Sequence, residues 1–600
     1  MHTLRAFGSV VVGLVLLAAT APEAKAAIPD SERAVLLSLF ENTNGIGWTI
    51  NTNWCDGACP ASGSFSFGAP GTECDWYGIS CDEAQTHVLA IALGALYPGS
   101  GNNLVGTLPD LSPLEELVYF SAEGNYLSGE IPDIQGLAQL ETFRVGSNQL
   151  TGNIPALSGM SNLREYSVGS NHLEGVIPAL AGLPNLRTLE VEANQLSGTI
   201  PNLFELANLE FFSARYNQLS GPIPPLNALV HLVYFYVDYN QLTGNLPSLR
   251  GLWSLQQFYA DANYLIGILP DLTDLPNLEA FSVSQNGLSG ELPDLDLLPS
   301  MTYFNVSINQ FTGQIPKIGQ RLWTFNASQN QLSGSIPSFS GNSQLSSFYA
   351  ASNNLSGGIP DLSEATSLYS IDLSSNDLSG PIPDLTQNLY LSAVDFASDH
   401  LQGSIPPLPP RLFYLDVSNN QLTGTLPELP SPEALNTLKV GHNQLMGTIP
   451  DLSGAAYLQE LDISYNQFEG QILLPASSTW LHFVDASHNQ LSGAIPEISS
   501  LSTLYSFDVS YNMLTGSVPE ASPEAYLTIF KVGANRLTGA VPPPSQFPYQ
   551  ENVMLCPNPL DTTPGPYDAD WNARTGYTPW WATPYATNQC DDLFTQGFES

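Results

Sequence analysis

The sequence predicts a solenoid of about twenty stacked turns, most of them 23 residues long. The phrase Asn-x-Leu-x-Gly-x-Ile-Pro, with conservative replacements, occurs twenty times between Asn102 and Asn535. Seventeen of the nineteen intervals between successive phrases are 23 residues and two are 21. A fixed period in the twenties indicates one structural unit per period, stacked on its neighbours. Such a fold offers a long surface, which favours a binding function.

Each unit contains the pattern of one short strand. In one of them, the apolar residues Phe212 and Ala214 alternate with polar ones, which is the period of a half-buried strand. Proline follows the apolar residue that closes the phrase in nineteen units. Because proline lacks an N–H and disfavours helix at the preceding residue, we expect extended or 3-10 structure on the outer side.

Two residues of the repeated phrase, Gly and Asn, predict features of the backbone. Glycine is the fifth residue of all twenty phrases, which predicts a positive φ or a close approach by the next turn. The repeated Asn is expected to be buried, because its amide can both donate to and accept from backbone groups of adjacent turns. Asp399 is the single exception. An ionised carboxylate cannot donate, so we expect one weakened inter-turn hydrogen bond there.

The phrase closely resembles the leucine-rich repeat, in the plant-specific subtype with Leu-x-Gly-x-Ile-Pro, over residues 85–545. The resemblance implies a β-rich solenoid of the α/β horseshoe class. It further implies a concave parallel β-sheet with one strand per unit, and a convex side that is extended or 3-10 rather than α-helical.

Residues 1–26 have the pattern of a secretory signal peptide, with Arg5, an apolar stretch and Ala24-Lys25-Ala26. The mature chain is expected to begin at Ala27 and to have no transmembrane segment. This predicts an exported monomer, located outside the cell, at its surface or in the envelope. The formal net charge of −41 disfavours nucleic acid and anionic membranes as partners.

All six cysteines lie outside the repeats, and an exported chain favours disulfides. The segment Cys74-Asp-Trp-Tyr-Gly-Ile-Ser-Cys81 resembles the N-terminal cap of plant-type repeat proteins, which implies a cap at 27–84 and a Cys74–Cys81 bond. Proximity favours Cys55–Cys59. Asn552-Val-Met-Leu-Cys556-Pro-Asn-Pro-Leu560 resembles the start of the C-terminal cap of the same family, which implies a Cys556–Cys590 bond and a cap with a tail at 546–600. A zinc site formed by the four N-terminal cysteines is an alternative that export disfavours.

Outward-facing positions of the strands predict the binding surface. Tyrosine offers an apolar ring and a hydroxyl, and it is enriched where proteins bind partners. The expected ligand-binding residues are Phe211, Tyr216, Tyr234, Tyr236, Tyr239, Tyr259, Tyr303 and Tyr349. The alternative is a cross-strand aromatic ladder that only stabilises the sheet.

The same outward column becomes acidic further along the chain. Its carboxylates are Asp372, Asp395, Asp416, Asp462, Asp485 and Asp508. Carboxylates spaced about 4.8 Å apart repel one another, which raises their pKa values or invites Ca²⁺. The alternative is that this aspartate is ordinary consensus for the repeat. No other cofactor is expected.

We find no catalytic motif, so the sequence predicts a non-catalytic protein. The predicted function is recognition of an extracellular protein, peptide or glycan on the concave face. One alternative is an inhibitor of a secreted polysaccharide-degrading enzyme, by analogy with plant inhibitors of this repeat subtype. The other is an ice- or mineral-binding surface, suggested by the Ser or Thr that usually follows the Asn by three residues.

Overall fold

The computed structural model describes residues 27–94, 101–429, 431–475, 478–543 and 552–581. The chain divides into two units, Met1–Ser197 and Gly198–Ser600, and each is described separately below. The predicted signal peptide at 1–26 lies outside the described residues, as does Cys590. The predicted domain boundaries remain predictions.

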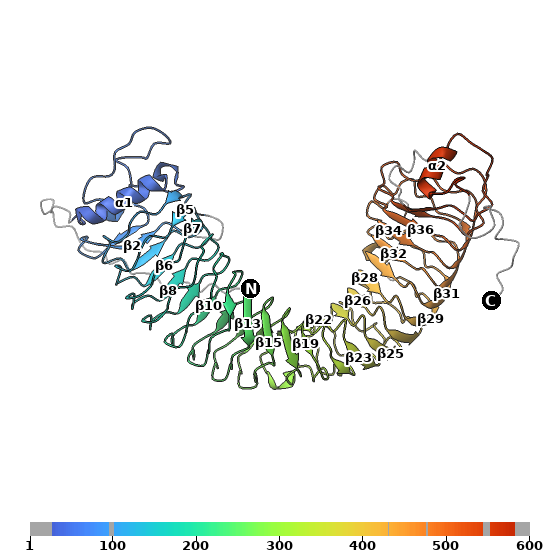
Figure 1. The fold of residues 1–600 in the computed structure, drawn as a ribbon, viewed down its shortest axis with the longest axis horizontal. Coiled ribbons are helices and arrows are strands. Elements are labelled where there is room, and N and C mark those ends of the chain that lie inside the picture. The colour runs from blue at the N-terminus through green and yellow to red at the C-terminus, as the bar shows by residue number, and fades with distance from the viewer. Residues whose placement is uncertain (1–26, 95–100, 430, 476–477, 544–551, 582–600) are drawn as a thin grey trace, which may run out of the picture. The chain divides into compact units, whose positions relative to one another are not determined.

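The first unit combines one α-helix and two short 3-10 helices with short strands (Figure 1). Its helices are α1 (Asp30–Asn42), η1 (Gly45–Gly47) and η2 (Glu73–Asp75). Its strands are β1 (Ile79–Cys81), β2 (Val88–Ala92), β3 (Val105–Thr107), β4 (Tyr119–Ser121), β5 (Tyr126–Glu130), β6 (Thr142–Arg144), β7 (Gln149–Thr151), β8 (Glu165–Ser167) and β9 (Thr188–Glu190). β1 pairs antiparallel with β2, and β2, β4, β6, β8 and β9 then pair in parallel.

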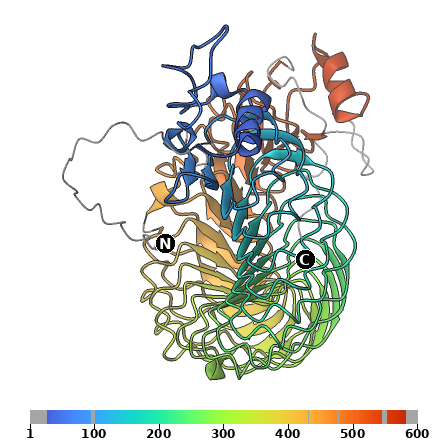
Figure 2. The same ribbon diagram turned by 90° about the vertical axis from the view of Figure 1, so that its left-hand side faces the viewer.

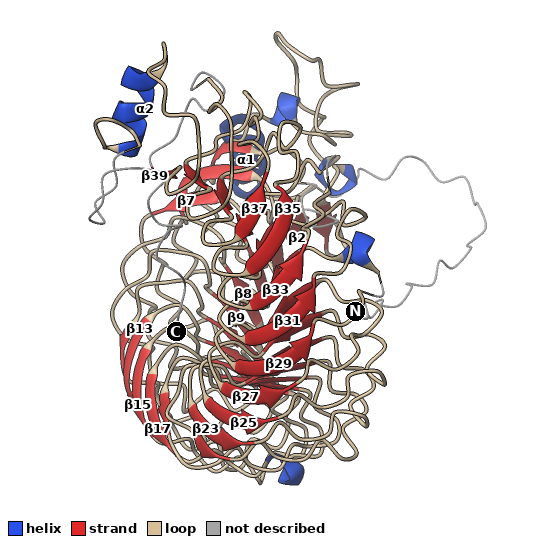
Figure 3. Cartoon of the chain, turned by 90° about the vertical axis from the view of Figure 1, so that its right-hand side faces the viewer, coloured by secondary structure: helices blue, strands red, loops and turns tan. Residues whose placement is uncertain are grey.

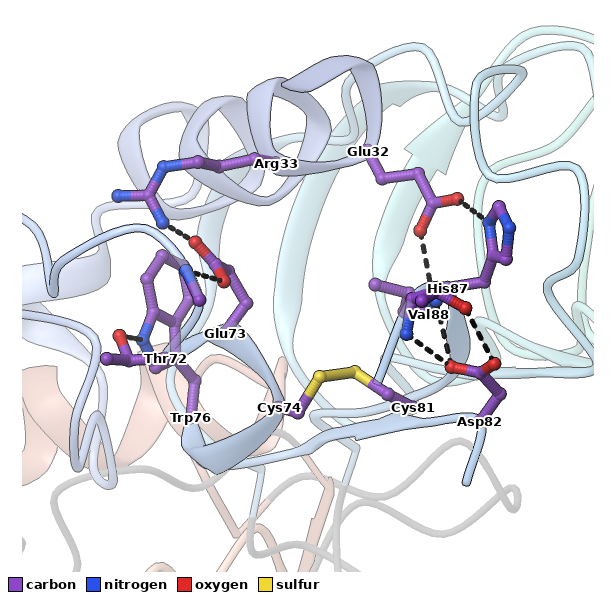
Figure 4. The surroundings of a disulfide bond; sticks show 12 residues. Glu32, Arg33, Thr72, Glu73, Cys74, Trp76, Cys81, Asp82, His87 and Val88 are labelled. Carbon is purple, nitrogen blue, oxygen red and sulfur yellow. Dashed lines mark hydrogen bonds and ion pairs between the residues drawn. A yellow bond between two sulfur atoms is a disulfide. The ribbon is translucent and has the colours of Figure 1, made fainter. Parts of the chain in front are cut away.

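The segment around α1 is held by disulfides and ion pairs instead of a regular sheet. Figure 2 shows it in blue, with α1 followed by irregular loops. The structure confirms the Cys74–Cys81 and Cys55–Cys59 bonds. Figure 4 shows Arg33 of α1 paired with Glu73, and the carboxylate of Glu32 bonded to His87 on the other side of the Cys74–Cys81 bond. These contacts link α1 to the first strands.

The main sheet of the second unit has one three-residue strand per turn. All neighbours pair in parallel with one residue opposite one residue, from Phe211↔Tyr234 to Lys531↔Met554. The strands are β10 (Phe211–Ser213), β12 (Tyr234–Tyr236), β14 (Gln257–Tyr259), β16 (Ala280–Ser282), β18 (Tyr303–Asn305), β20 (Thr324–Asn326), β22 (Ser347–Tyr349), β24 (Ser370–Asp372), β26 (Ala393–Asp395), β28 (Tyr414–Asp416), β30 (Thr437–Lys439), β32 (Glu460–Asp462), β34 (Phe483–Asp485), β36 (Ser506–Asp508), β38 (Ile529–Lys531) and β39 (Asn552–Met554).

Within this unit the main sheet lines the inner side of the curve in Figure 1, and we call its outward-pointing side the concave face. The middle residue of each strand points into the core, while the first and third point to the concave face. The described parallel-strand solenoid confirms the predicted fold class.

A second row of short strands was not part of the sequence prediction. These flank strands coincide with the repeated phrase, and Figure 3 shows β13, β15 and β17 side by side. They are β11 (Ser220–Gly221), β13 (Gln241–Asn245), β15 (Tyr264–Gly267), β17 (Gly287–Gly290), β19 (Gln310–Phe311), β21 (Ser333–Gly334), β23 (Asn354–Gly357), β25 (Asp377–Gly380), β27 (His400–Gly403), β29 (Gln421–Thr425), β31 (Gln444–Thr448), β33 (Gln467–Gly470), β35 (Gln490–Ala494) and β37 (Met513–Thr515). Stacking at a fixed period brings these extended segments into register, so they pair as well.

The remaining helices of the second unit are short. They are η3 (Leu295–Leu297), η4 (Pro432–Ala434) and α2 (Asp568–Thr575). Between residues 101 and 543, the described residues contain no α-helix, as the recurring proline predicts. Cys556 is disulfide-bonded, but the predicted bond to Cys590 involves a residue outside the described part of the chain.

The core of the second unit contains a continuous stack of phenylalanine rings. Its members are Phe212, Phe235, Phe258, Phe281, Phe304, Phe325 and Phe348, all fully buried. Successive ring centroids are 5.0 to 6.1 Å apart and nearly parallel. This geometry is the offset stacking that aromatic pairs favour, and it follows from one ring per turn at the middle of each strand.

A second stack is formed by the repeated Asn. The Oδ1 atom of Asn240 accepts from the backbone N–H of Leu219 in the preceding turn at 2.9 Å, and its Nδ2 donates to the carbonyl of Ala214 at 2.9 Å. The pattern recurs through Asn535 and continues at Asn558. The predicted role of this residue is confirmed: its amide joins adjacent turns.

Asp399 accepts from the N–H of Leu378 at 2.8 Å, as an Asn would, but its buried Oδ2 has no hydrogen-bond partner. Burial raises the pKa of Asp399 to about 7. The hydrogen-bonding defect expected from the sequence is therefore present at Asp399.

The glycines of the repeated phrase share a positive φ, and Gly221 is one that also meets the preceding turn. Its φ is +74°, and a Cβ there would lie 2.9 Å from the Cγ2 atom of Thr199 in the preceding turn. Both alternatives in the prediction, positive φ and close approach, apply together.

Candidate ligand-binding surface

Seven of the eight predicted ligand-binding residues gather on the concave face, on consecutive or nearly consecutive turns. Phe211 lies opposite Tyr234 in the register of β10 and β12, and Tyr236 lies opposite Tyr259 in β12 and β14. We call the group the tyrosine cluster; it comprises Phe211, Tyr216, Tyr234, Tyr236, Tyr239, Tyr259 and Tyr303.

The rings of the tyrosine cluster contact one another. Tyr216 and Tyr239 stack with centroids 4.5 Å apart, and each exposes 48% of its surface. Tyr236 meets Phe211 and Tyr259 edge-on, at 5.5 and 5.4 Å. These contacts fix the rings before any ligand arrives. Tyr349 makes no ring contact with the cluster within the described residues, so it stands apart.

Hydrogen bonds and burial keep the phenols neutral. The hydroxyl of Tyr236 donates to Gln257 at 2.6 Å and that of Tyr234 donates to Gln256 at 3.1 Å. Burial is the main cause that raises the pKa of Tyr259 to about 12, and it also raises the pKa of Tyr236. Tyr236 and Tyr259 therefore present protonated hydroxyls, which can donate and accept hydrogen bonds.

An ion pair within the tyrosine cluster was missed by the sequence analysis. The guanidinium of Arg215 binds Oδ2 of Asp238, with Nε at 3.0 Å and Nη2 at 2.9 Å. Its central carbon lies 5.2 Å from the ring centre of Tyr216 and 5.5 Å from that of Tyr236, within the range of cation–π attraction. Both charged residues precede a repeated Asn by two positions, Arg215 before Asn217 and Asp238 before Asn240.

Asp238 is nearly inaccessible. It exposes 1% of its surface, and its Oδ1 atom is buried without a hydrogen-bond partner. Burial raises the pKa of Asp238, although the charge of Arg215 opposes the shift.

The six predicted aspartates also lie on the concave face, as third residues of their strands. Oδ1 of each accepts from the backbone N–H two residues later, for example Asp416 from Ser418 at 3.0 Å and Asp462 from Ser464 at 2.9 Å. This is an Asx-type turn, so each carboxylate has a structural role. Among the described residues, no group of three or more acidic, His or Cys side chains is arranged to hold a metal ion.

Two of these aspartates have raised pKa values, for which burial is the main cause. Burial first, and then the charge of Asp372, raise the pKa of Asp395 to about 6. Burial also raises the pKa of Asp485, with Asp508 and Asp462 adding to the shift.

A second aromatic stack lies beside these aspartates. His442, Tyr465, His488 and Tyr511 alternate along the residue before the repeated Asn, with centroids 4.2, 4.0 and 4.1 Å apart. All four have φ values between +50° and +57°. Burial lowers the pKa of His488, which favours the neutral form of its imidazole within the stack.

We call the six strands that carry the predicted aspartates (β24, β26, β28, β32, β34 and β36) the aspartate strands. A hollow of about 280 Å³ lies along β30, β32, β34 and β36. Its lining includes the Lys439–Glu460 ion pair, at 2.5 Å, the ring of Phe483, and the carboxylates of Asp462 and Asp485. It is separate in sequence from the tyrosine cluster.

Several Ser and Thr hydroxyls of the flank strands bond to the protein. Ser220 donates to the carbonyl of Gly198 at 3.3 Å and Ser289 to that of Gly267 at 3.3 Å. These hydroxyls support the stacking of turns, which leaves less hydrogen-bonding capacity for an ice or mineral surface.

A family model described as Leucine Rich Repeat matches residues 367–389 and 411–432. The fold is a leucine-rich-repeat solenoid. Solved structures similar to this solenoid include the Arabidopsis receptor kinase HAESA in complex with the peptide hormone IDA and the co-receptor SERK1, at 27% identity and a TM-score of 0.71, covering 87% of this chain and 95% of that one. The plant peptide hormone receptor RGFR1, in complex with RGF2, matches at 26% identity and a TM-score of 0.62, covering 81% and 95%.

A bacterial protein is also similar: YopM from Yersinia enterocolitica matches at 27% identity and a TM-score of 0.51, covering 79% of the solenoid chain and 89% of its own. No curated protein sequence matches the chain. Within the described residues, no helix has the length and apolar character needed to cross a membrane.

Proposed function

We propose that this solenoid is an exported, non-catalytic binding protein that holds an extracellular ligand on its tyrosine cluster. The observation that carries the proposal is the pre-formed group of contacting rings on the concave face, with two of them, Tyr216 and Tyr239, half exposed. Rings already fixed by their neighbours lose little entropy on binding, which favours affinity.

Two further findings support the proposal. HAESA and RGFR1, which have the same fold, are seen with peptide hormones, so this kind of solenoid can bind extracellular ligands. The disulfides of the N-terminal segment fit an oxidising compartment, which agrees with the predicted signal peptide.

The test is a ligand screen on the immobilised mature chain, using glycans, peptides and secreted proteins. Tyr236→Ala/Tyr259→Ala removes two rings from the cluster, and it should weaken capture at least tenfold, since aromatic anchors carry a large share of binding energy.

Tyr349→Ala is the matched control, because it removes a tyrosine from the same outward column outside the cluster. Equal capture by the wild-type chain and the double variant would rule out the tyrosine cluster as the binding surface.

A further inference from the structure

A row of exposed aromatic side chains lies where strands of the main sheet begin, on turns that follow the tyrosine cluster. Its members are Trp323, Tyr369 and Phe413, each the residue directly before a strand (β20, β24 and β28), and we call them the strand-entry row. They expose 59%, 56% and 47% of their surface. In the two turns between them, the same position holds Ser346 and Ser392. Large rings therefore alternate with small residues from turn to turn.

Backbone hydrogen bonds fix the spacing of the strand-entry row. The N–H of Ser346 donates to the carbonyl of Trp323 at 2.9 Å, and the N–H of Tyr369 donates to the carbonyl of Ser346 at 2.8 Å. The ladder continues through Ser392 to Phe413, at 2.9 and 2.8 Å. Hydrogen-bonded neighbours in a sheet lie about 4.8 Å apart, so successive members of the row are about 10 Å apart and the outer two about 19 Å apart.

An arginine accompanies each outer member of the row. Arg321 and Arg411 precede Trp323 and Phe413 by two positions, in the two units that are 21 residues long. Both arginines are exposed, and the guanidinium of Arg411 lies 5.1 Å from the ring centre of Tyr390. In the part of the chain that the structure describes, neither arginine makes an ion pair, although acidic residues number 56 and basic ones 15. Two exposed cations at this spacing favour a ligand with two anionic groups.

A polyproline II peptide has the repeat that these positions require. It has three residues per turn and rises about 3.1 Å per residue, so one turn covers about 9.3 Å and two turns about 18.6 Å. Residues three apart can therefore meet successive rings of the row, and residues six apart can meet both arginines. The carbonyls of such a peptide are not bonded internally. The indole N–H of Trp323 and the hydroxyl of Tyr369 can donate to them.

We propose that the strand-entry row and its two arginines bind an extended, proline-rich segment of an extracellular protein that carries acidic side chains six residues apart. The prolines pack on the rings, and the acidic side chains pair with Arg321 and Arg411. Ordering costs little, because a polyproline II segment is already extended before it docks on aromatic side chains. This surface is separate from the tyrosine cluster, so the inference does not depend on the proposed function.

Other ligand shapes match this surface less well. A helical peptide meets a straight row at every seventh residue, so two such repeats cover about 21 Å, which is longer than the row. A strand cannot pair with the backbone of the row, because that backbone already bonds to the neighbouring turns. A neutral ligand leaves Arg321 and Arg411 without counter-charges. An acidic polysaccharide supplies the charges but not the prolines, and the experiment distinguishes it.

The test is a fluorescence-anisotropy titration of the mature chain with three labelled peptides. In the first, Pro-Asp-Pro-Pro-Leu-Pro-Pro-Asp-Pro, the acidic residues are six positions apart, which is about two turns of polyproline II. The second has Asn in place of both Asp. The third, Pro-Asp-Pro-Pro-Pro-Asp-Pro-Leu-Pro, has the same composition with the acidic residues closer together. We expect the first peptide to bind about tenfold more tightly than the second, and also more tightly than the third.

Two double variants separate the charges from the rings. Arg321→Gln/Arg411→Gln should abolish the preference for the first peptide over the second, because it removes both cations. Trp323→Ala/Phe413→Ala should weaken the binding of both peptides about tenfold, because it removes the outer rings. All four positions are exposed, so thermal melting of the variants should match that of the wild-type chain.

The matched controls lie outside the strand-entry row. They are Arg536→Gln, at another exposed arginine, and Tyr505→Ala, at the exposed ring directly before β36. Both should leave the affinity for the first peptide unchanged. Equal affinity for the three peptides, or no binding of any of them at millimolar concentration, overturns the inference. So does tighter binding of a linear uronic-acid oligosaccharide that Arg321→Gln/Arg411→Gln abolishes, because the ligand would then be a polysaccharide.

Discussion

The tyrosine cluster and the aspartate strands occupy the same positions of the same repeat, yet they satisfy their side chains in different ways. In β12 and β14, the third strand residue is Tyr236 or Tyr259, and rings pack on rings beside the Arg215–Asp238 pair, whose carboxylate is buried. In β26 and β28 it is Asp395 or Asp416, and each carboxylate holds its own turn through a backbone N–H. The scaffold fixes where side chains point, whereas their partners decide which of them remain free to bind.

The largest expected effect is a difference in stability between variants that break the Arg215–Asp238 pair and the Lys439–Glu460 pair. Arg215→Ala leaves Asp238 charged and buried, so we expect the free energy of unfolding to fall by about 3 kcal/mol. Lys439→Ala breaks the more exposed Lys439–Glu460 pair and should cost less than about 1 kcal/mol. Urea unfolding monitored by circular dichroism measures both variants. Equal losses of unfolding free energy would show that Asp238 is no more buried in solution than Glu460.

The next effect concerns Asp399, in the aspartate region. Asp399→Asn should restore the missing donor and raise stability by about 2 kcal/mol at pH 8. The folded pKa of about 7 lies above the unfolded value of 3.8. The wild-type carboxyl therefore costs nothing below pH 4, and its destabilising effect grows as pH rises through 7.

The gain from Asp399→Asn should consequently be smallest at pH 4 in the same urea experiment. Asn376→Asp, which places the same defect in the neighbouring turn, is the converse control and should destabilise at pH 8. A gain for Asp399→Asn that is independent of pH would contradict the assigned cause.

A smaller effect is expected at Asp395, whose folded pKa of about 6 lies above the unfolded 3.8. Its contribution to stability is fully present below pH 4 and is lost as pH rises through 6. Asp395→Asn should therefore stabilise the chain at pH 8 by about 1 kcal/mol, after allowance for solvent screening. Asp462→Asn, at a carboxylate paired with Ser464, is the comparison, and thermal melting at pH 4.5 and 8 gives the readout.

The smallest effect is expected from calcium. Each aspartate already accepts a hydrogen bond from the turn that follows it. Millimolar Ca²⁺ should therefore shift the melting temperature by less than about 1 °C. A true site, at a Ca²⁺ concentration about 100 times its Kd, would instead stabilise the chain by about 2.7 kcal/mol. A shift of several degrees that Asp462→Asn/Asp485→Asn abolishes would establish the cation-binding interpretation instead.

The features that repeat were predictable from the sequence, because a residue required at every turn is present in twenty copies. The alternation at Phe212 and Ala214 predicted the strands, and the Asn ladder and its defect at Asp399 followed from hydrogen-bonding capacity. The flank strands could not be predicted from the sequence, because their pairing arises only when extended segments of successive turns are stacked.

The Arg215–Asp238 pair was not predictable for a related reason. It occurs once, and its significance depends on the distances to Tyr216 and Tyr236, which a sequence pattern does not contain. The stack of His442, Tyr465, His488 and Tyr511 was also missed. It depends on a backbone with positive φ at all four residues, which brings their rings together and which the sequence pattern does not specify.

Hydrogen exchange of the wild-type chain, with and without a ligand from the screen, tests the central claim most directly. If the ligand binds the tyrosine cluster, the backbone amides of turns 211–217, 234–240 and 257–263 exchange more slowly when it is bound. No change is expected for the equivalent amides of turns 460–466 and 483–489, which include Asp462 and Asp485. Protection confined to the aspartate turns would contradict the claim that the tyrosine cluster is the binding surface.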